Sequence, residues 1–429
     1  MARIQRYLWE EVDPASLVVF RVVYGVMAAI SAARFLWYGW VDRFFYQPEV
    51  FFHFPGFQWV APLPEPGMEV LFGLLVACGL AVASGWFWRV ALGVFVVGFT
   101  YVGLIDTTTY LNHYWQFRFI GFLMLFMPLS GAGEGDRVPA WPVWTLRLQL
   151  GLVYFWAGVA KLNGDWLLRG QPMEIWLTAR THLPVVGPLL AYDFLPHAMS
   201  IAGAVFDLTI LGWLLWPKSR PYAYAAVVFF HAATGFLFNI GMFPVIMIGA
   251  TTIFFAPDWP RRFIRSRGIP ALARLRGLPT LPKRAVLVLL SVWFALQFTL
   301  PLRHLAYPGD VLWTQEGYRF SWRVKLAERS GSLTYTVRDP STDKTWRVHP
   351  TRYLSRRQNE LASAEPAKIL QLAHHIAGDF ARRGHPNVAV YADCRVALNG
   401  HPSRRLIDPD VDLASQPYTI WHRDWIVHD

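Results

Sequence analysis

Charged residues are scarce in this chain of 429 residues: Asp, Glu, Lys and Arg make up 16%, whereas hydrophobic residues make up 54%. This balance disfavours a soluble globular fold. The chain has only two cysteines, Cys78 and Cys394, and because they lack metal-ligand or CxxC spacing, we expect no disulfide or cysteine metal site. The patterns GxGxxG, GxxxxGK[ST] and HExxH are missing, as is any internal repeat. Their absence removes the common nucleotide and zinc motifs, and we predict no metal site.

Long apolar segments are what the chain does contain. A helix needs about 20 largely apolar residues to cross a bilayer. Nine segments approach this length, the eighth being the shortest: 17–38, 68–84, 88–105, 114–130, 141–160, 199–216, 222–238, 242–256 and 285–300. The first is too long for a signal-peptide core and contains Arg21 and Arg34, so we expect it to be retained as an anchor. The sequence predicts a multi-pass α-helical membrane protein with about nine transmembrane helices.

The distribution of basic residues predicts the orientation of these helices. Cations precede the first segment and occupy the connections between segments two and three, four and five, and six and seven, and the densest run, DWPRRFIRSRGIPALARLRGLPTLPKR, links segments eight and nine. With nine helices all these loops lie on one side, and short basic loops face the cytoplasm. We therefore predict a cell (inner) membrane protein with a cytoplasmic N-terminus. Orientation accounts for the net charge of +11, so we predict no nucleic-acid partner.

The composition becomes polar after Pro301. The stretches YRFSWRVKLAE and SLTYTVRD alternate like strands, KTWRVHP is typical of a returning strand, residues 367–381 have helical periodicity, and NVAVYADCRVAL is a further strand. We predict a transmembrane domain over residues 1–300 and a small α+β extracytoplasmic domain over residues 301–429.

One apolar segment ends on a patterned cluster, YFWAGVAKLNGDW, which places Lys161 at the outer end of a helix. Burial in an apolar site favours the neutral form of an amine, which could then accept a proton from a weak acid. Ala157 and Gly158, within one turn before it, leave room for a flat ligand or a neighbouring helix. In the alternative interpretation, Lys161 extends to the interface and pairs with Asp165 four residues later.

Three further groups of polar residues lie on the predicted outer side. Asn112 and His113 stand where the fourth segment begins, and histidine can donate, accept or transfer a proton near neutral pH. His231 lies inside a membrane segment, where an ionisable residue suggests function, with an interhelical hydrogen bond as the alternative. Arg323 belongs to EGYRFSWRVKL, whose guanidinium groups could bind carboxylates of an acidic peptide or lie on a solvated strand. For most of the other ionisable residues within the segments, we expect Arg–Asp pairing inside the bundle; they are Arg21, Arg34, Arg118, Arg147 and Asp207.

Six motifs occur in a fixed order along most of the chain. They are DxxxYxNH, YFxAGVxKLxxDW, HxxxxxxFxIGMFP, FxPxWPR, GYxxSW and xRxxDPxVD, at residues 106–113, 154–166, 231–244, 255–261, 317–322 and 404–412. Together they resemble the vitamin K-dependent gamma-glutamyl carboxylases. The compact length is similar to that of the bacterial members, with an HTTM-like membrane domain, and puts the propeptide recognition of the animal enzymes in doubt.

The resemblance implies an enzyme that couples oxidation of reduced vitamin K, the hydroquinone, to carboxylation of glutamate. A lysine deprotonates the hydroquinone, molecular oxygen converts it into a strong base and finally an epoxide, and the base removes a γ-proton from glutamate so that carbon dioxide can add. The family's base lysine falls on Lys161, with Ala160 in place of the preceding lysine, and its Asn-His pair falls on Asn112 and His113. His231 and Arg323 are predicted helpers in substrate binding.

Physical chemistry is consistent with this reaction, because no ordinary side chain can remove the γ-proton and a reactive oxyanion needs shielding from water. A pocket between membrane helices would admit a lipid quinone from the membrane and a glutamate-containing peptide or protein from outside. The alternatives are a vitamin K epoxidase without peptide carboxylation and a non-enzymatic membrane scaffold, immunity or transport protein of the same fold. Transport would favour repeats, which the chain lacks.

Overall fold

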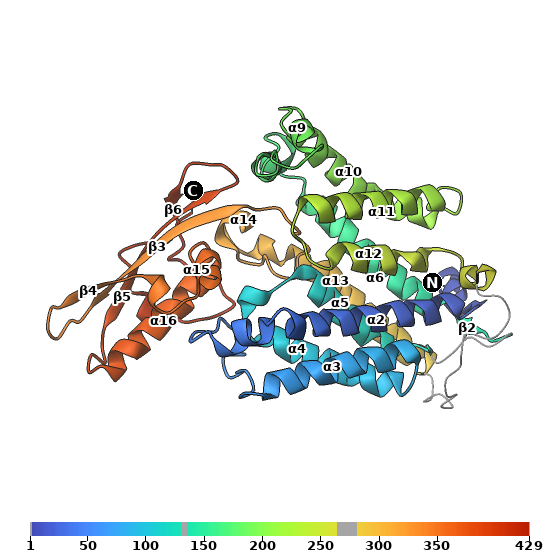
Figure 1. Cartoon of the computed structure of the whole chain (residues 1–429), viewed down its shortest axis with the longest axis horizontal. Helices are drawn as coiled ribbons and strands as arrows, with labels where there is room; N and C mark the ends of the chain where they lie inside the picture. Colours follow the sequence, from blue (N-terminus) through green and yellow to red (C-terminus); the bar gives the residue numbers. More distant parts are fainter. Residues whose placement is uncertain (1, 130–134, 264–280, 429) are drawn as a thin grey trace.

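The computed structural model describes residues 2–129, 135–263 and 281–428 (Figure 1). Each of the nine apolar segments contains a helix, and in Figure 1 these helices form a bundle with most of their axes running in a similar direction. The nine are α2 (Ala15–Trp37), α3 (Gly67–Ser84), α4 (Trp88–Ile105), α5 (Asn112–Met124), α6 (Trp141–Ala160), α10 (Leu195–Leu215), α11 (Arg220–Leu237), α12 (Phe243–Thr251) and α13 (Lys283–Thr299).

Six helices in the described part of the chain are long and apolar enough to cross a membrane. They are α2, α3, α4, α6, α10 and the continuous stretch Lys283–Ala306, which includes α13. The other three are α11, which is not among these six, α5 with 13 residues and α12 with nine. The chain is therefore a multi-pass helical membrane protein, and a count of nine spans stays a prediction.

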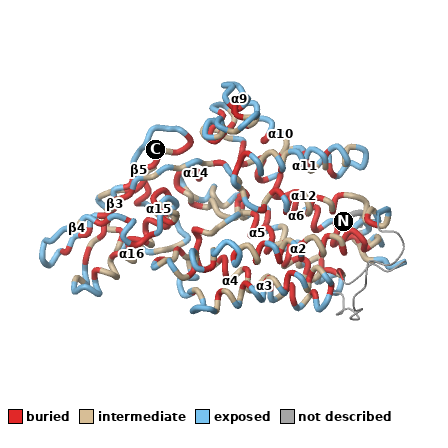
Figure 2. Tube along the Cα trace, viewed as in Figure 1, coloured by how far each residue is buried: buried red, intermediate tan, exposed pale blue. Residues whose placement is uncertain are grey.

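Small residues let the first two long helices approach each other closely. A Cβ atom added to Gly25 on α2 would lie 2.3 Å from the backbone nitrogen of Ala83, and one added to Gly79 on α3 would lie 2.4 Å from that of Ala29. Such contacts are a main source of helix association in a bilayer, where burial of apolar surface gives little driving force. Helices α2 and α6 are the most enclosed of the six, with 72% and 78% of their apolar windows buried, whereas exposed positions run along α3 and α11 (Figure 2).

Basic residues gather at the end of the bundle where the N-terminus lies. Strand β1 (Glu11–Val12) pairs there with β2 (Val138–Pro139). Next to this pair, Asp13 accepts a hydrogen bond from Arg261 Nε at 2.5 Å and lies 4.0 Å from Arg137 Nη1. Arg137 lies in the loop between α5 and α6, and Arg261 lies in the loop after α12. Their shared contact with Asp13 agrees with the prediction that these two loops lie on one side. Most of the predicted basic run, residues 264–280, lies outside the described residues.

The residues after the last membrane helix form an antiparallel sheet at the opposite end of the bundle (Figure 1). Its strand order is β4–β3–β5–β6, and the helices α15 and α16 pack beside it. The bounds are β3 (Arg329–Arg338), β4 (Thr345–Val348), α15 (Arg356–Ala362), α16 (Pro366–Arg382), β5 (Ala389–Leu398) and β6 (Arg404–Arg405). Every second residue of β5 is buried, as expected for a strand with one face on a core.

The predicted strand YRFSWRVKLAE is wrong, because residues 318–328 form turns and irregular backbone. Phe320, Trp322 and Lys325 have φ angles of 61°, 56° and 50°, which a strand does not accommodate. The aromatic side chains are anchors in the membrane part rather than alternating strand residues. The ring of Phe320 lies 4.9 Å from that of Trp115, and Trp322 is buried.

The remaining elements are short. They are α1 (Ala2–Trp9), α7 (Gly164–Leu167), α8 (Met173–Thr178), α9 (Gly187–Leu190), α14 (Val311–Thr314), the π-helix Asp42–Tyr46, and 3₁₀ turns at Thr107–Thr109, Thr252–Phe254, Trp259–Arg262, Leu300–Ala306, Pro350–Arg352 and Leu413–Ser415. The elements α7, α8 and α9 lie between α6 and α10, and α7 and α8 contribute side chains to the wall of a cavity beside α6.

Candidate active site

A cavity of about 360 Å³ lies between α6, α10, α11 and α12. This volume is in the range of small-molecule sites. Its wall is almost entirely apolar, with aromatic rings from α10, α11 and α12 and from the connection after α6. The polar or ionisable side chains on the wall are Tyr154, Lys161, Asp207, His231, Thr234 and Lys325. The arrangement suits a largely apolar ligand that carries a few polar atoms.

Lys161 follows the last residue of α6, and its side chain turns back into the bundle. The Nζ atom donates to Asp207 Oδ2 at 2.6 Å and to the carbonyl oxygen of Ala157, one turn earlier in α6, at 3.3 Å. The Trp166 ring covers the amine, with Nζ 5.3 Å from the ring centroid. Only 7% of the lysine side chain is exposed. The alternative in which Lys161 reaches the interface and pairs with Asp165 is therefore wrong.

A close approach of α6 and α10 brings the lysine and the aspartate together. A Cβ atom on Gly158 would lie 2.9 Å from the backbone nitrogen of Leu208, the residue after Asp207. Ala157, next to Gly158, is on the cavity wall. The sequence suggested that Ala157 and Gly158 make room for a neighbouring helix or a ligand. In the structure Gly158 makes room for α10, and Ala157 borders the cavity.

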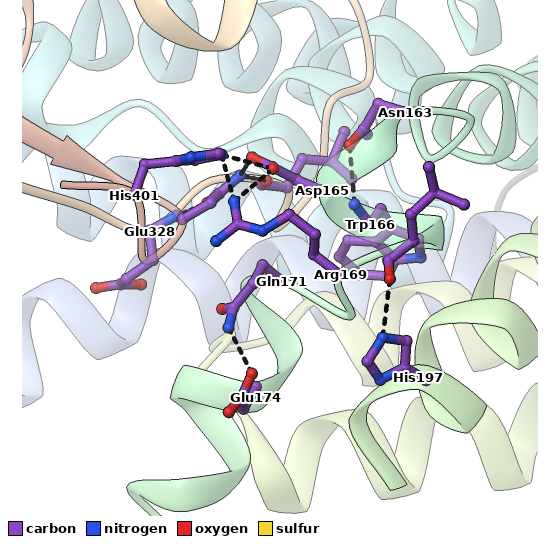
Figure 3. A network of polar contacts seen from close by, with 12 residues as sticks. Asn163, Asp165, Trp166, Arg169, Gln171, Glu174, His197, Glu328 and His401 are labelled. Carbon is purple, nitrogen blue, oxygen red and sulfur yellow. Dashed lines mark hydrogen bonds and ion pairs between the residues drawn. The ribbon is translucent and has the colours of Figure 1, made fainter. Parts of the chain in front are cut away.

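Asp165 and Trp166 hold the segment that follows Lys161. Asn163 caps the N-terminus of α7, and its side-chain oxygen accepts a hydrogen bond from the backbone nitrogen of Trp166 at 3.0 Å (Figure 3). The Trp166 indole donates to the carbonyl of Ser200 on α10 at 2.7 Å. Asp165 lies 2.8 Å from His401 Nε2 and accepts from Asn399 Nδ2 at 3.0 Å, beyond the end of β5. The Asp-Trp pair thus links the membrane part to the C-terminal part.

His231 lies on α11 and contributes to the cavity wall. Its Nε2 is 2.9 Å from the hydroxyl of Tyr154 on α6, which is the interhelical hydrogen bond expected as an alternative. The other ring nitrogen, Nδ1, is buried and has no hydrogen-bond partner. A buried polar atom without a partner is costly, so Nδ1 is a candidate contact for a ligand's polar atom.

His113 does not line this cavity. Its ring centroid lies 5.7 Å from that of Phe243. Phe243 in turn lines the cavity, and its ring centroid lies 5.4 Å from that of His231. The Nε2 atom of His113 is buried without a hydrogen-bond partner. His113 therefore stands behind one phenylalanine ring, next to the site rather than in it.

Asn112 and Arg323 lie beside each other although 211 positions separate them. Asn112 Nδ2 donates to the carbonyl of Arg323 at 3.4 Å and Oδ1 accepts from Tyr110 at 2.9 Å. The Arg323 guanidinium lies 3.1 Å from His304 Nε2. The next two residues, Val324 and Lys325, are on the cavity wall. Asn112 thus fastens the segment that covers the cavity on the side of the C-terminal part.

Three of the arginines inside the bundle bind carbonyl groups, so the expected Arg–Asp pairing is wrong for these three. Arg21 donates to Leu129 O at 3.0 Å, Arg118 to Phe99 O at 2.7 Å and Arg147 to Ile253 O at 3.0 Å. Most of these acceptors lie at or near helix ends, where carbonyls lack an intrahelical donor. Asp207 therefore forms its ion pair with Lys161 instead of with an arginine. An acidic residue at membrane depth is the signal that could have identified Asp207 as part of the site.

No group of three or more potential metal ligands occurs among the residues that the structure describes. The polar groups of the site are two amines, a carboxylate, an imidazole, a phenol and an aliphatic hydroxyl around an apolar volume. Such a set can transfer protons and bind an apolar ring, and the helices around it limit the access of water.

Two domain families account for most of the chain. The HTTM domain matches residues 9–259, and the lumenal domain of vitamin K-dependent gamma-carboxylase matches residues 282–429. The fold and these matches define an integral membrane protein whose helical domain precedes a domain of the lumenal type. The chain belongs to the vitamin K-dependent gamma-carboxylase family, which confirms the resemblance seen in its motifs.

A curated protein with a different name shows a weaker similarity to part of the chain. Protoheme IX farnesyltransferase 1 of Paramagnetospirillum magneticum is 27% identical over 237 residues, which are 53% of this chain and 76% of that protein. No solved structure matches the chain. An identity of this size does not transfer an activity, so a functional assignment has to rest on the two domain matches and on the geometry of the cavity.

Proposed function

We propose that the protein is a gamma-glutamyl carboxylase that couples oxidation of reduced vitamin K to carboxylation of glutamate in a peptide or protein. The observation that carries the proposal is the Lys161 amine, which is enclosed in an apolar cavity and lies 2.6 Å from Asp207. The membership of the chain in the carboxylase family supports this assignment. The domain boundary that goes with it lies between residues 300 and 301.

The residues of the cavity fit a hydroquinone. The ring and its lipid chain match the apolar wall, and the two hydroxyl groups match the polar atoms of Lys161 and of His231, whose Nδ1 has no partner. A lipid quinone would enter from the membrane beside Phe229, which lines the cavity and is 77% exposed. No buried charge would have to be created for the ligand to bind.

The protein's own contribution is to place groups and to exclude water. Lys161 takes a proton from the ligand hydroxyl, with Asp207 next to it so that no isolated charge forms. The hydroquinone, when bound, supplies together with molecular oxygen the strong base that no side chain can match. The apolar wall keeps water from quenching that base, and His113 lies behind Phe243 without lining the cavity.

The glutamate substrate approaches from the side of the C-terminal part. There Val324 and Lys325 line the cavity, and the guanidinium of the preceding Arg323, which contacts His304 and whose Nε has no partner, binds the substrate's carboxylate in this proposal. Carbon dioxide, the third small reactant, needs no charged site. In this proposal the N-terminus is cytoplasmic and the C-terminal domain is extracytoplasmic in the cell (inner) membrane.

The test uses the purified full chain in lipid nanodiscs with reduced vitamin K, labelled bicarbonate and a glutamate-containing peptide. We expect epoxide and labelled peptide from the wild type and neither from Lys161→Ala, because proton abstraction by a side chain contributes about 100-fold or more. Asp193→Ala, an exposed position before α10, is the control variant.

The products separate the alternatives. Epoxide without label would replace the proposal by a vitamin K epoxidase. Neither product from folded wild-type protein would favour a scaffold, immunity or transport protein of the same fold. Equal products from the wild type and Lys161→Ala would contradict the role of the lysine.

A further inference from the structure

The Lys161 side chain points back into the bundle, and this direction is unusual for a lysine at a helix end. A lysine at the end of a membrane helix normally extends its amine outward to the interface. Here the side chain runs the other way, since Nζ donates to the carbonyl one turn earlier in its own helix. The carbonyl contact at 3.3 Å is long, whereas the contact with Asp207 Oδ2 is 2.6 Å. The carboxylate is the stronger attraction.

Asp207 is placed to exert this attraction. It lies in the middle of α10, its side chain is 6% exposed, and the close approach of α6 and α10 at Gly158 and Leu208 fixes its distance from the lysine. The other ionisable side chains on the cavity wall are Tyr154 on α6, His231 on α11 and Lys325 beyond the membrane helices. Tyr154 and His231 are bonded to each other, so the lysine is the partner of the aspartate.

We propose that Asp207 is the positioning residue of Lys161: it holds the amine inside the cavity and stores the proton that the amine must release before it can act as a base. This inference rests on the proposed function and identifies a residue to which neither the motifs nor the family matches assign a role.

The proton balance of this arrangement is closed. In the resting pair a proton moves from the ammonium to Oδ2, so that an N–H bond breaks, an O–H bond forms and the pair stays neutral overall. The neutral amine then takes the proton of a ligand hydroxyl. This leaves an ammonium, a neutral carboxyl group and a ligand anion, so positive and negative charge appear together. No proton has to cross the apolar wall during this step.

The first experiment needs no activity. The protein in nanodiscs is treated with a water-soluble N-hydroxysuccinimide ester, and acylation of each lysine is measured by mass spectrometry. In the wild type we expect Lys161 to be protected and the exposed Lys344 to react fully. In Asp207→Ala the amine loses its partner and extends to the interface, so we expect its acylation to rise at least about tenfold. Asp193→Ala should resemble the wild type. Unchanged protection of Lys161 in Asp207→Ala would overturn the positioning role.

The second experiment separates positioning from proton storage. The amide of Asp207→Asn can still accept a hydrogen bond from the amine but cannot take up its proton. We expect Lys161 to stay protected while kcat for epoxide formation falls about 100-fold at neutral pH, with little change in KM. Asp207→Glu, which keeps a carboxylate, should retain more activity than Asp207→Asn.

The outcomes distinguish this inference from the proposed function. Two results would overturn proton storage: a kcat of Asp207→Asn equal to that of the wild type, or an Asp207→Glu protein no more active than Asp207→Asn. If the wild type forms no epoxide, the proposed function fails, and the acylation experiment still decides whether Asp207 positions the lysine. Thermal unfolding of each variant identifies any that do not fold.

Discussion

At the scale of single residues, the cavity combines two kinds of polar group. Lys161 and Asp207 satisfy each other, whereas His231 has one bonded nitrogen and one without a partner. A paired group keeps its geometry when the site is empty. An unpaired one gains a hydrogen bond when a ligand arrives, so it contributes to affinity rather than to the shape of the site.

This difference predicts the effect of removing the imidazole. In His231→Leu we expect the KM for the hydroquinone to rise about tenfold, because a hydrogen bond of roughly 1.4 kcal/mol is lost, with a smaller change in kcat. Tyr154→Phe is the control, since it removes the tyrosine hydroxyl but keeps the free nitrogen Nδ1, and its KM should change less than about threefold. An unaltered KM in His231→Leu would show that the ligand does not use Nδ1.

At the scale of elements, the contact between α6 and α10 sets the distance between the two charged groups. This contact depends on the absence of a side chain at Gly158. Since the lysine and the aspartate sit on different helices, a change of a few tenths of an ångström between the helix axes alters their hydrogen bond directly.

A methyl group at this contact should therefore affect both stability and activity. We expect Gly158→Ala to lower the free energy of unfolding by about 1–3 kcal/mol through overpacking and to reduce epoxide formation. On α10, Gly212 has no atom within 4 Å of an added Cβ, so Gly212→Ala should match or slightly exceed the wild type. Thermal unfolding in one detergent and the epoxide assay measure both effects. A Gly158→Ala protein as stable and active as Gly212→Ala would contradict the importance of this contact.

At the scale of the whole molecule, Asp165 joins the membrane part to the C-terminal part. Partial burial raises the pKa of Asp165, but hydrogen bonds from His401 and Asn399 outweigh this effect and hold the pKa below its usual value. A carboxyl group with a lowered pKa stabilises the folded state above its ordinary pKa and loses this contribution as the pH falls through the folded value. The link is therefore intact at neutral pH.

Breaking this link should loosen the C-terminal part without unfolding it. In Asp165→Ala we expect faster hydrogen exchange in residues 399–405, with a coupling energy of about 1 kcal/mol between Asp165 and Asn399 in a double-mutant cycle. Glu360→Ala, an exposed position on α15, is the matched control. Exchange in Asp165→Ala as slow as in the control would show that other contacts hold the two parts together.

The two ends of the molecule should also differ in accessibility. Ser330 is exposed on β3, and Lys218 is exposed in the turn between α10 and α11. We expect Ser330→Cys to react with an impermeant thiol reagent outside intact cells and Lys218→Cys to react only after lysis. The parent protein, whose two cysteines are buried, is the blank. Reaction of Lys218→Cys in intact cells, with protection of Ser330→Cys, would reverse the proposed orientation.

Local patterns predicted much of this architecture. The apolar segments form helices at the expected places, and residues 332–339, 344–350 and 387–398 overlap the observed strands, because segment length and periodicity are local properties of the chain. The same argument failed for residues 318–328, where alternating aromatic residues anchor a turn in the membrane part. An alternating pattern indicates that every second side chain is buried, but it does not indicate whether a sheet or another surface buries them.

The sequence by itself determined that the chain enters a membrane, that Lys161 ends a helix and that its motifs belong to the carboxylase family. Only the tertiary structure decided that Lys161 pairs with Asp207, 46 positions away, and not with Asp165, and that the arginines bind carbonyls. The physical reason is that hydropathy follows from a residue's neighbours in the chain. The partner of a buried charge depends instead on which helices come close enough to touch, and here the missing side chain of Gly158 allows that approach.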